Sequence, residues 1–170
     1  MAYTAIDSPG TTAFNTVTYT GSGTAQSITG VGFQTDFGFI RKDTGEDSYL
    51  YGPATGKSGS DYYYISANDA AAQATSSAAV ASIDSDGFTF QSGTPLANVN
   101  TGSAAYTSWN WKGGTTTGID TTGSTITPSA YSFNQAAGFS AVKYTGNNTS
   151  GALLAHGLGA VPEMVWLKNL

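Results

Sequence analysis

Residues 14–42 read FNTVTYTGSGTAQSITGVGFQTDFGFIRK and contain two short alternating runs separated by glycine-rich stretches. In TVTYTG, Val17 and Tyr19 fall on one face of an extended strand, and in FGFIRK, Phe37 and Phe39 do so. Runs of this length and period, bounded by Gly, Asn or Asp, are typical of short strands. This stretch therefore predicts two short strands.

Two runs further along the chain repeat the two-residue period. GFTF places Phe88 and Phe90 together, and YTSWNWK places Trp109 and Trp111 on one face with Tyr106 on the other. Because large aromatic side chains dominate core burial, we expect Trp109 and Trp111 to face the core. A platform that stacks on sugars is the alternative interpretation of this pair.

The composition of the 170 residues agrees with a β-rich domain, since Gly accounts for 22 of them and only 10% are charged. We expect an all-β fold, an antiparallel β-sandwich of the jelly-roll or concanavalin-like type, with at most one short helix. The one helix-compatible stretch is Asn68-Asp69 followed by AAAQATSSAAVAS, which predicts a short helix or an ordered loop.

The opening phrase returns at residues 139–169 as FSAVKYTGNNTSGALLAHGLGAVPEMVWLKN. The offset is 125 residues (139 − 14) at the start and 127 (157 − 30) after the loop. The matched pairs include Phe14/Phe139, Val17/Val142, Tyr19/Tyr144, Gly21/Gly146, Gly30/Gly157, Gly32/Gly159, Asp36/Glu163, Phe39/Trp166, Ile40/Leu167 and Arg41/Lys168. We expect the two segments to form equivalent strand pairs, with Tyr19 and Tyr144 in the same environment.

A period this long indicates duplication of a domain and not a solenoid. We expect a first β-sandwich repeat at residues 1–112, a Gly/Thr/Ser-rich linker at 113–130 and the start of a second repeat at 131–170. The linker could hold a short strand at 124–127. The chain is expected to be the front of a longer tandem protein.

Charge and composition argue against several classes of partner. The net charge is −5 with no basic patch, which disfavours nucleic acid. There is no cysteine, and no apolar run approaches the ~20 residues of a membrane span, so we expect no membrane insertion. Residues 1–4, MAYT, lack the features of a secretory signal, so we expect release from the cell by lysis. We expect no cofactor.

The tyrosine run Tyr62, Tyr63 and Tyr64 is the candidate binding surface. Alternation puts Tyr62 and Tyr64 on one face and Tyr63 on the other. Tyrosines stack on sugars and anchor interfaces, while the plainer interpretation makes one face core and the other a subunit contact.

The acidic residues and the single histidine favour structural roles. Asp84 and Asp86 in DSDG begin a calcium-loop pattern whose later ligands are absent, so ordinary turn chemistry is favoured over a calcium site. His156 in HGLG is expected to be a turn residue. The remaining carboxylates show no spacing that indicates acid–base catalysis, and this set is Asp36, Asp43, Glu46, Asp47 and Asp61. We expect no catalytic residues.

Three phrases together carry a resemblance to a known family: MAYTAIDSPG…VTYTG, DSDGFTF…NVNTGSAAYTSWNWKGG and GSTITPS…AAGFSAVKYTGNNTSG…HGLGAVPEMVWLKN. They resemble a tandem repeat domain of unknown function found in virion proteins of tailed bacteriophages. The resemblance covers residues 1–52 and 83–169 best, and 53–82 depart most. It implies a concanavalin-like or jelly-roll sandwich in a virion structural or fibre-like protein, and it supplies no catalytic residues.

The sequence thus predicts a non-enzymatic structural module of a bacteriophage virion, in a tail fibre, an appendage or a surface-adhesion protein. Its expected partners are other virion proteins and itself, as a homo-oligomer such as a trimer, with a host surface glycan as a further partner. A head decoration protein and a carbohydrate-binding or glycan-degrading module are the alternatives.

Overall fold

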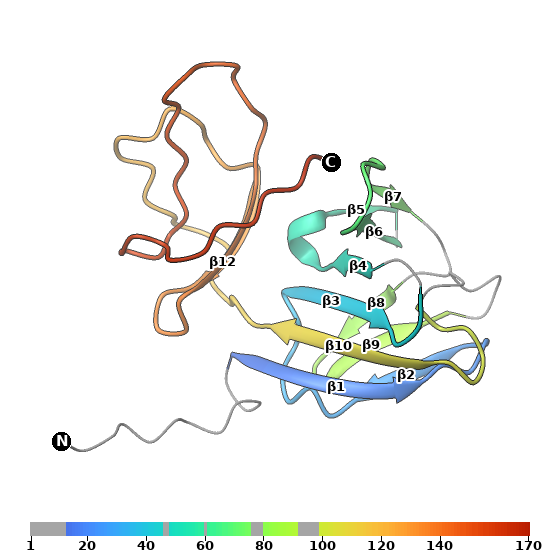
Figure 1. Ribbon diagram of the computed structural model, residues 1–170. Coiled ribbons are helices and arrows are strands. Elements are labelled where there is room, and N and C mark those ends of the chain that lie inside the picture. Colours follow the sequence, from blue (N-terminus) through green and yellow to red (C-terminus); the bar gives the residue numbers. More distant parts are fainter. Residues whose placement is uncertain (1–12, 46–47, 60, 76–79, 92–98) are drawn as a thin grey trace.

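The computed structural model describes residues 13–45, 48–59, 61–75, 80–91 and 99–170. The chain forms an antiparallel β-sandwich with a further β-hairpin in a C-terminal part that lies beside it (Figure 1). The all-β, antiparallel sandwich predicted from the alternating runs is therefore confirmed.

The larger sheet has seven strands, and all of their pairings are antiparallel. Its order is β1 (Phe14–Thr20), β10 (Ala105–Trp111), β3 (Phe37–Lys42), β4 (Ser48–Tyr51), β6 (Asp61–Ser66) and β5 (Lys57–Ser58), with β7 (Ala74–Thr75) also paired to β6. A 3₁₀ turn, η1 (Pro53–Thr55), follows β4.

The second layer is a three-stranded sheet in the order β2 (Gln26–Thr29), β9 (Gly87–Phe90) and β8 (Val80–Asp84). Phe88 and Phe90 lie on one face of β9, as the sequence predicts, and both are completely buried. Phe88 meets the Tyr51 ring at 5.3 Å, and Phe90 meets the Tyr19 ring at 5.8 Å. The core lies between these two layers.

Trp109 and Trp111 do not face this core, contrary to our expectation. They share one face of β10, but the buried residues of that strand are Tyr106, Ser108 and Asn110 on the other face. The inner face carries the small side chains of Ser108 and Asn110 because the Tyr51 ring from β4 fills the space beside them. A Cβ at Gly38, opposite Asn110 on β3, would overlap the Tyr51 ring.

The inner face also holds a buried polar network centred on Asn110. Its Oδ1 accepts hydrogen bonds from the hydroxyls of Tyr51 (2.8 Å), Thr35 (3.2 Å) and Ser108 (3.2 Å). Its Nδ2 donates to the carbonyl oxygens of Asn15 and Ser108. Buried polar groups that are all paired in this way fix one arrangement of the neighbouring strands.

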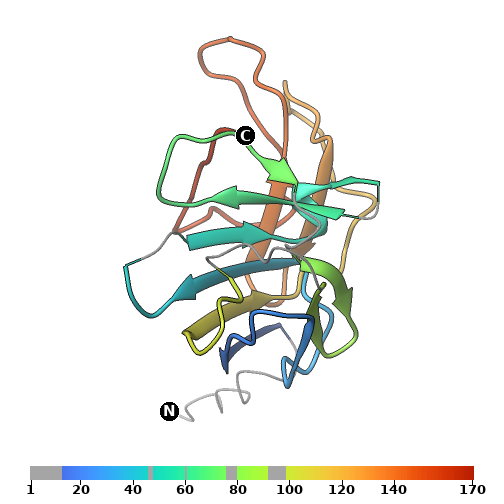
Figure 2. The same cartoon turned by 90° about the vertical axis from the view of Figure 1, so that its right-hand side faces the viewer.

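The C-terminal part contains the antiparallel hairpin of β11 (Ala130–Asn134) and β12 (Phe139–Lys143). In Figure 2 this hairpin runs across the strands of the large sheet. The segment expected to be a linker is bonded to this part near each end, through bridges between Thr115 and Phe133 and between Ile126 and Leu154. The short strand expected at 124–127 is reduced to that second bridge.

The two halves of the sequence duplication do not form equivalent strand pairs. β12 forms as expected, but it pairs with β11, whereas its counterpart β1 pairs with β10. The counterpart of β3, residues 164–168, is not a strand. Tyr19 packs against the core, whereas Tyr144 is 37% exposed. A strand requires neighbours, and no described residue pairs with 164–168 as β10 and β4 pair with β3.

The alanine-rich stretch forms no helix in its described portion, 68–75. The Asp69 carboxylate accepts a hydrogen bond from the Ala71 amide at 2.6 Å, an Asx turn that competes with helix, and β7 follows. Within the described ranges, no helix is long and apolar enough to cross a membrane.

Candidate functional site

The tyrosine run lies on β6, with the predicted alternation. Tyr62 is 8% exposed and belongs to the core, with the Lys57 ammonium 4.0 Å from its ring centre. Tyr64 is half-buried and meets Tyr49 edge to face at 5.2 Å. Only Tyr63 points to the other face, where the Lys143 ammonium lies 5.6 Å from its ring centre. The run is therefore not a shared exposed platform, because Tyr62 is buried.

Asp86 lies in the turn between β8 and β9, as the sequence favoured, but its carboxylate bonds a loop that is distant in sequence. Its carboxylate accepts hydrogen bonds from the backbone amides of Gly32 and Gly30, which fixes the loop between β2 and β3. These two donors, Gly32 first, hold the pKa of Asp86 below its ordinary value. Asp84 accepts hydrogen bonds from Ser82 and Thr89 on its own hairpin.

These carboxylates do not gather into a metal site. Within the part of the chain that the structure describes, no group of three or more His, Asp or Glu residues could hold a metal ion. Asp36 accepts from the backbone amides of Gly113 and Gly114, both at 2.9 Å. Glu46 and Asp47 lie outside the described residues, as does the side chain of Asp61.

His156 lies in an irregular loop with a bend at Gly157, and not in a turn between two strands as expected, because no strand follows it among the described residues. Its Nδ1 accepts a hydrogen bond from the Leu158 backbone amide at 3.2 Å. Gly157, which follows it, has a positive φ of 75°. The histidine thus shapes the loop that leads into the C-terminal segment.

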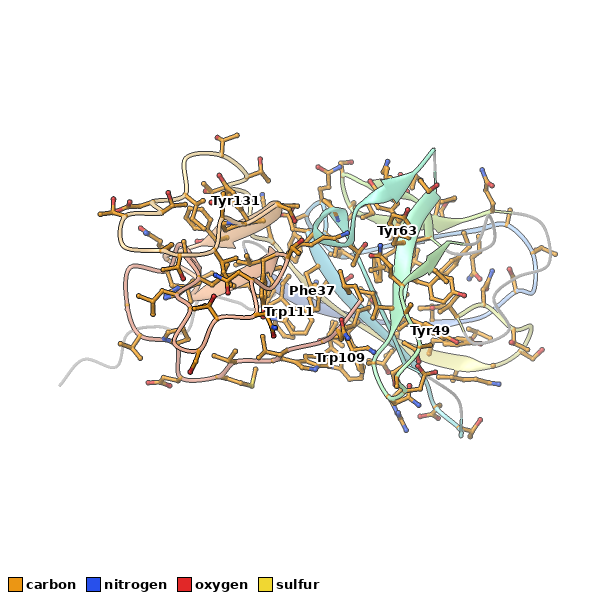
Figure 3. All side chains as sticks on the ribbon, turned by 90° about the horizontal axis from the view of Figure 1, so that it is seen from above. Phe37, Tyr49, Tyr63, Trp109, Trp111 and Tyr131 are labelled. Atoms are coloured by element: carbon orange, nitrogen blue, oxygen red, sulfur yellow. The ribbon has the colours of Figure 1, made fainter. Side chains whose placement is uncertain are left out.

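The most distinctive surface is an aromatic face on the outside of the large sheet, made by side chains of β1, β3 and β10. Trp111 meets Phe14 at 5.0 Å and Phe37 at 5.7 Å, and Trp109 meets Phe39 at 5.3 Å. Figure 3 shows Phe37, Trp109 and Trp111 at the junction between the sheet and the C-terminal part.

The C-terminal part covers some of this aromatic face. Phe139 of β12 stacks on Trp111 with ring centres 5.9 Å apart, and it also meets Phe37. Trp166 meets Phe39 edge to face at 5.9 Å. Since Phe139 stacks on the Trp111 ring and Phe14 and Phe37 also contact it, a flat sugar platform at this tryptophan is disfavoured.

Residues 161–168 follow as a segment without regular structure, which we call the C-terminal strap. It is anchored by the Lys168 ammonium, which donates to the carbonyl oxygen of Asp69 at 2.8 Å. Its large apolar side chains nevertheless stay exposed: Val161 (90%), Met164 (83%), Val165 (68%), Trp166 (52%) and Leu167 (70%). This strap and the adjoining aromatic face form the candidate functional site, an apolar contact surface.

Sequence reasoning missed the aromatic face because it assigned each strand one buried side. A signal was available in FGFIRK and YTSWNWK, where large side chains occur on both faces. Strands that are covered on both faces carry this pattern. The exposed strap itself was expected to be a strand, and only its apolar character was foreseen.

No curated protein and no solved structure shows significant similarity to the chain. One family model matches residues 9–170, which is nearly the whole sequence. The chain therefore belongs to the family described as domain of unknown function DUF7483.

Proposed function

We propose that this protein is a non-enzymatic structural module of a bacteriophage virion, one that works by assembly and surface presentation in a tail fibre, an appendage or an adhesion protein. The bacteriophage origin rests on the resemblance of its three sequence phrases to virion repeat domains. The assembly role rests on the structure, and the exposed apolar side chains of the C-terminal strap carry it.

The strap is a contiguous apolar surface of the kind that marks interaction sites. Fully burying one side chain of this type is worth roughly 1.5–3 kcal/mol. Covering the exposed parts of its five large side chains would therefore give on the order of 5–10 kcal/mol. Association itself costs roughly 4–15 kcal/mol. The strap thus favours contacts in an array of linked modules, where a high effective concentration lowers that cost.

The polar surface suits the same role. Ser, Thr and Asn supply most of its polar groups, and only 10% of the 170 residues are charged. Such surfaces make hydrogen-bonded contacts without the desolvation cost of charges. The expected partners are other copies of the chain, in a homo-oligomer such as a trimer, and other virion proteins.

Light scattering coupled to size-exclusion chromatography tests the assembly role. We expect an oligomer that dissociates when the strap is made polar in the double variant Met164→Ser, Val165→Ser. The matched control is Leu153→Ser, which changes an apolar side chain that is 58% exposed outside the strap. A wild-type chain that stays monomeric at high micromolar concentration, with Trp166 fluorescing as a solvent-exposed ring, would contradict the proposal.

The virion role needs a separate measurement. Mass spectrometry of purified phage particles should detect the chain, and a cryo-EM map should place it on a tail appendage. Density on the capsid surface would instead indicate a head decoration protein. Absence of the chain from the particles would exclude both positions.

A further inference from the structure

The duplicated segments share their turns even though their strands are paired differently. Residues in the left-handed region recur at matched positions: Gly23 (φ 73°) and Asn148 (φ 57°), Gly30 (φ 90°) and Gly157 (φ 75°), and Gly32 (φ 83°) and Gly159 (φ 70°). Since few non-glycine residues adopt this conformation, its retention at Asn148 indicates the same local fold in both copies.

The turn after each YTG phrase shows the equivalence in its hydrogen bonds. In the first copy the Thr24 amide donates to the Ser22 hydroxyl oxygen at 3.2 Å. At positions 125 residues later, the Thr149 amide donates to the Asn147 side-chain oxygen at 3.1 Å. The chain therefore builds the same side-chain-capped turn twice.

In the first copy Asn100 fills this turn. Its Oδ1 accepts from the Ser22 amide at 2.9 Å, its Nδ2 donates to the Thr24 carbonyl oxygen at 2.6 Å, and its own carbonyl accepts from Gly23 at 2.8 Å. Asn100 is fully buried there. Its segment, residues 99–104, leads directly into β10.

In the second copy no described residue takes the place of Asn100. The turn residues Asn147, Asn148 and Thr149 are exposed and line an open hollow of about 510 Å³, together with Tyr144 and Leu154. The turn that holds an asparagine side chain in the first copy is thus accessible in the second.

The tyrosine of each YTG phrase shows the same contrast. The Tyr19 hydroxyl donates to the Val99 carbonyl oxygen at 2.7 Å, and its ring stacks on Tyr106 with centres 5.1 Å apart. Tyr144, its counterpart, makes no such bond or ring contact with the described residues. The groups missing around Tyr144 are therefore those that residues 99–106 provide around Tyr19.

The hydrogen-bonding edges of β1 and β12 can be compared in the same way. On β1, the Ala13 carbonyl accepts from Lys112 and the Gly21 amide donates to Ala104. In an antiparallel pair every second residue directs its amide and carbonyl toward the same neighbour, so Val17, which lies an even number of positions from Ala13 and Gly21, directs both groups toward β10. The counterpart of Val17 is Val142 on β12.

The corresponding edge of β12 is unpaired within the described residues. β11 uses the opposite edge, because the Lys143 carbonyl accepts from Ser129 and Phe133 directs its own amide and carbonyl to Thr115. The backbone groups of Val142 therefore point away from β11. Next to them the Ser140 hydroxyl is buried without a hydrogen-bond partner among the described residues.

We propose that this edge of β12, with Tyr144 and the 147–149 turn, is an acceptor for an antiparallel strand whose chemistry is that of residues 99–111. Such a strand carries an asparagine for the turn, a tyrosine six positions later to stack on Tyr144, and then alternating aromatic and small polar residues. This inference rests on the proposed assembly function and names the segment that the second copy binds.

By its correspondence to β3, the strap is the segment expected on the other side of the bound strand. In the first copy β10 lies between β1 and β3, with Trp109 opposite Phe39. The counterpart of Phe39 is Trp166. A bound strand that pairs with residues 164–168 as β10 pairs with β3 would therefore give them the neighbour that they lack.

The strand comes from another copy of the repeat and not from β10 of a second folded molecule. β10 is central in its own sheet, and Asn100, Tyr106 and Asn110 are at most 2% exposed. Donating β10 would unfold the sandwich that presents the acceptor.

A labelled synthetic peptide of residues 99–112, VNTGSAAYTSWNWK, is the probe, and fluorescence anisotropy with the full chain is the readout. We expect saturable binding that a scrambled peptide lacks. Replacing the peptide asparagine with leucine should weaken binding about tenfold, since it removes two hydrogen bonds to the turn.

The variant Val142→Pro removes the amide on the unpaired edge while leaving the bonds to β11 intact. It should abolish binding, whereas Val142→Ala, which keeps the amide, should retain it. Tyr144→Ala, at an exposed position, gives a second variant that carries little risk to folding and should weaken binding several-fold.

Two results would overturn the site: no saturable binding of the peptide at millimolar concentration, or binding that neither Val142→Pro nor Tyr144→Ala changes. The oligomeric state is measured separately. A monomeric chain that binds the peptide would refute self-assembly and support the acceptor site. An oligomeric chain that does not bind the peptide would support self-assembly and refute the acceptor site.

Discussion

The buried network around Asn110 makes the sharpest stability prediction. In Asn110→Ala the hydroxyls of Thr35, Tyr51 and Ser108 lose their shared acceptor, and all three residues are at most 2% exposed. A net hydrogen bond is worth ~1 kcal/mol, and an unsatisfied buried group costs ~1–3 kcal/mol. Adding the small void left by the amide, we expect a loss of ~3–5 kcal/mol in the free energy of unfolding.

Urea denaturation followed by tryptophan fluorescence measures this loss. The matched control is Asn169→Ala, at an exposed asparagine, which should change the free energy of unfolding by less than ~0.5 kcal/mol. Tyr51→Phe alone removes one bond of 2.8 Å and should cost ~1 kcal/mol. In the Asn110→Ala background the same change should be close to neutral, because the hydroxyl no longer has that acceptor.

The double-mutant cycle decides whether the network acts as a unit. Effects of Asn110→Ala and Tyr51→Phe that simply add would mean that the tyrosine hydroxyl is satisfied elsewhere, and the reasoning would fail. A cost below ~1 kcal/mol for Asn110→Ala would have the same meaning.

Three further predictions follow from local geometry. Gly38→Ala should cost ~2 kcal/mol or more because its Cβ would overlap the Tyr51 ring, whereas Gly146→Ala, with open space around it, should be tolerated in the same denaturation assay. Asp86 has a lowered pKa, so its contribution to the stability of the folded state is present above pH ~4 and is lost as pH falls through the folded-state pKa. In Asp86→Asn, unfolding measured over the same acid range should lack this loss of stability. Burial raises the pKa of Tyr19 and of Tyr51, so stability should fall above pH ~10, where the unfolded chain ionises these groups first, and absorbance at ~295 nm should show delayed ionisation of Tyr19 and Tyr51.

The sequence was sufficient to predict which residues share a strand face but not which face is buried. Trp109 and Trp111 lie on one face of β10 opposite Tyr106, as the period requires. Which face meets the second layer depends on Tyr51 and Phe88, whose rings fill the inner side. That choice is made by packing between segments distant in sequence, which a two-residue period does not encode.

For the candidate binding residues, too, the sequence predicted some positions and left others open. Asp86 was correctly placed in a turn because Asp and Gly before a strand favour one, but the partners of its carboxylate, Gly30 and Gly32, lie more than fifty residues away, and a local pattern does not encode them. For Tyr62 the sequence left a binding surface and a core face as alternatives, because tyrosine suits both environments, and the position of β6 in the sheet decides for the core.

The duplicated phrase separates what local sequence determines from what it leaves to context. Its turns recur at Gly23 and Asn148 because a turn is closed by bonds between residues two or three apart. Its second strand forms only in the first copy, because β3 needs β10 and β4 on its two edges. The strap therefore carries the pattern of a strand without its partners. If the peptide of residues 99–112 binds, circular dichroism should show added strand signal, since the unpaired edge of β12 and residues 164–168 would then gain the neighbour that β1 and β3 already share.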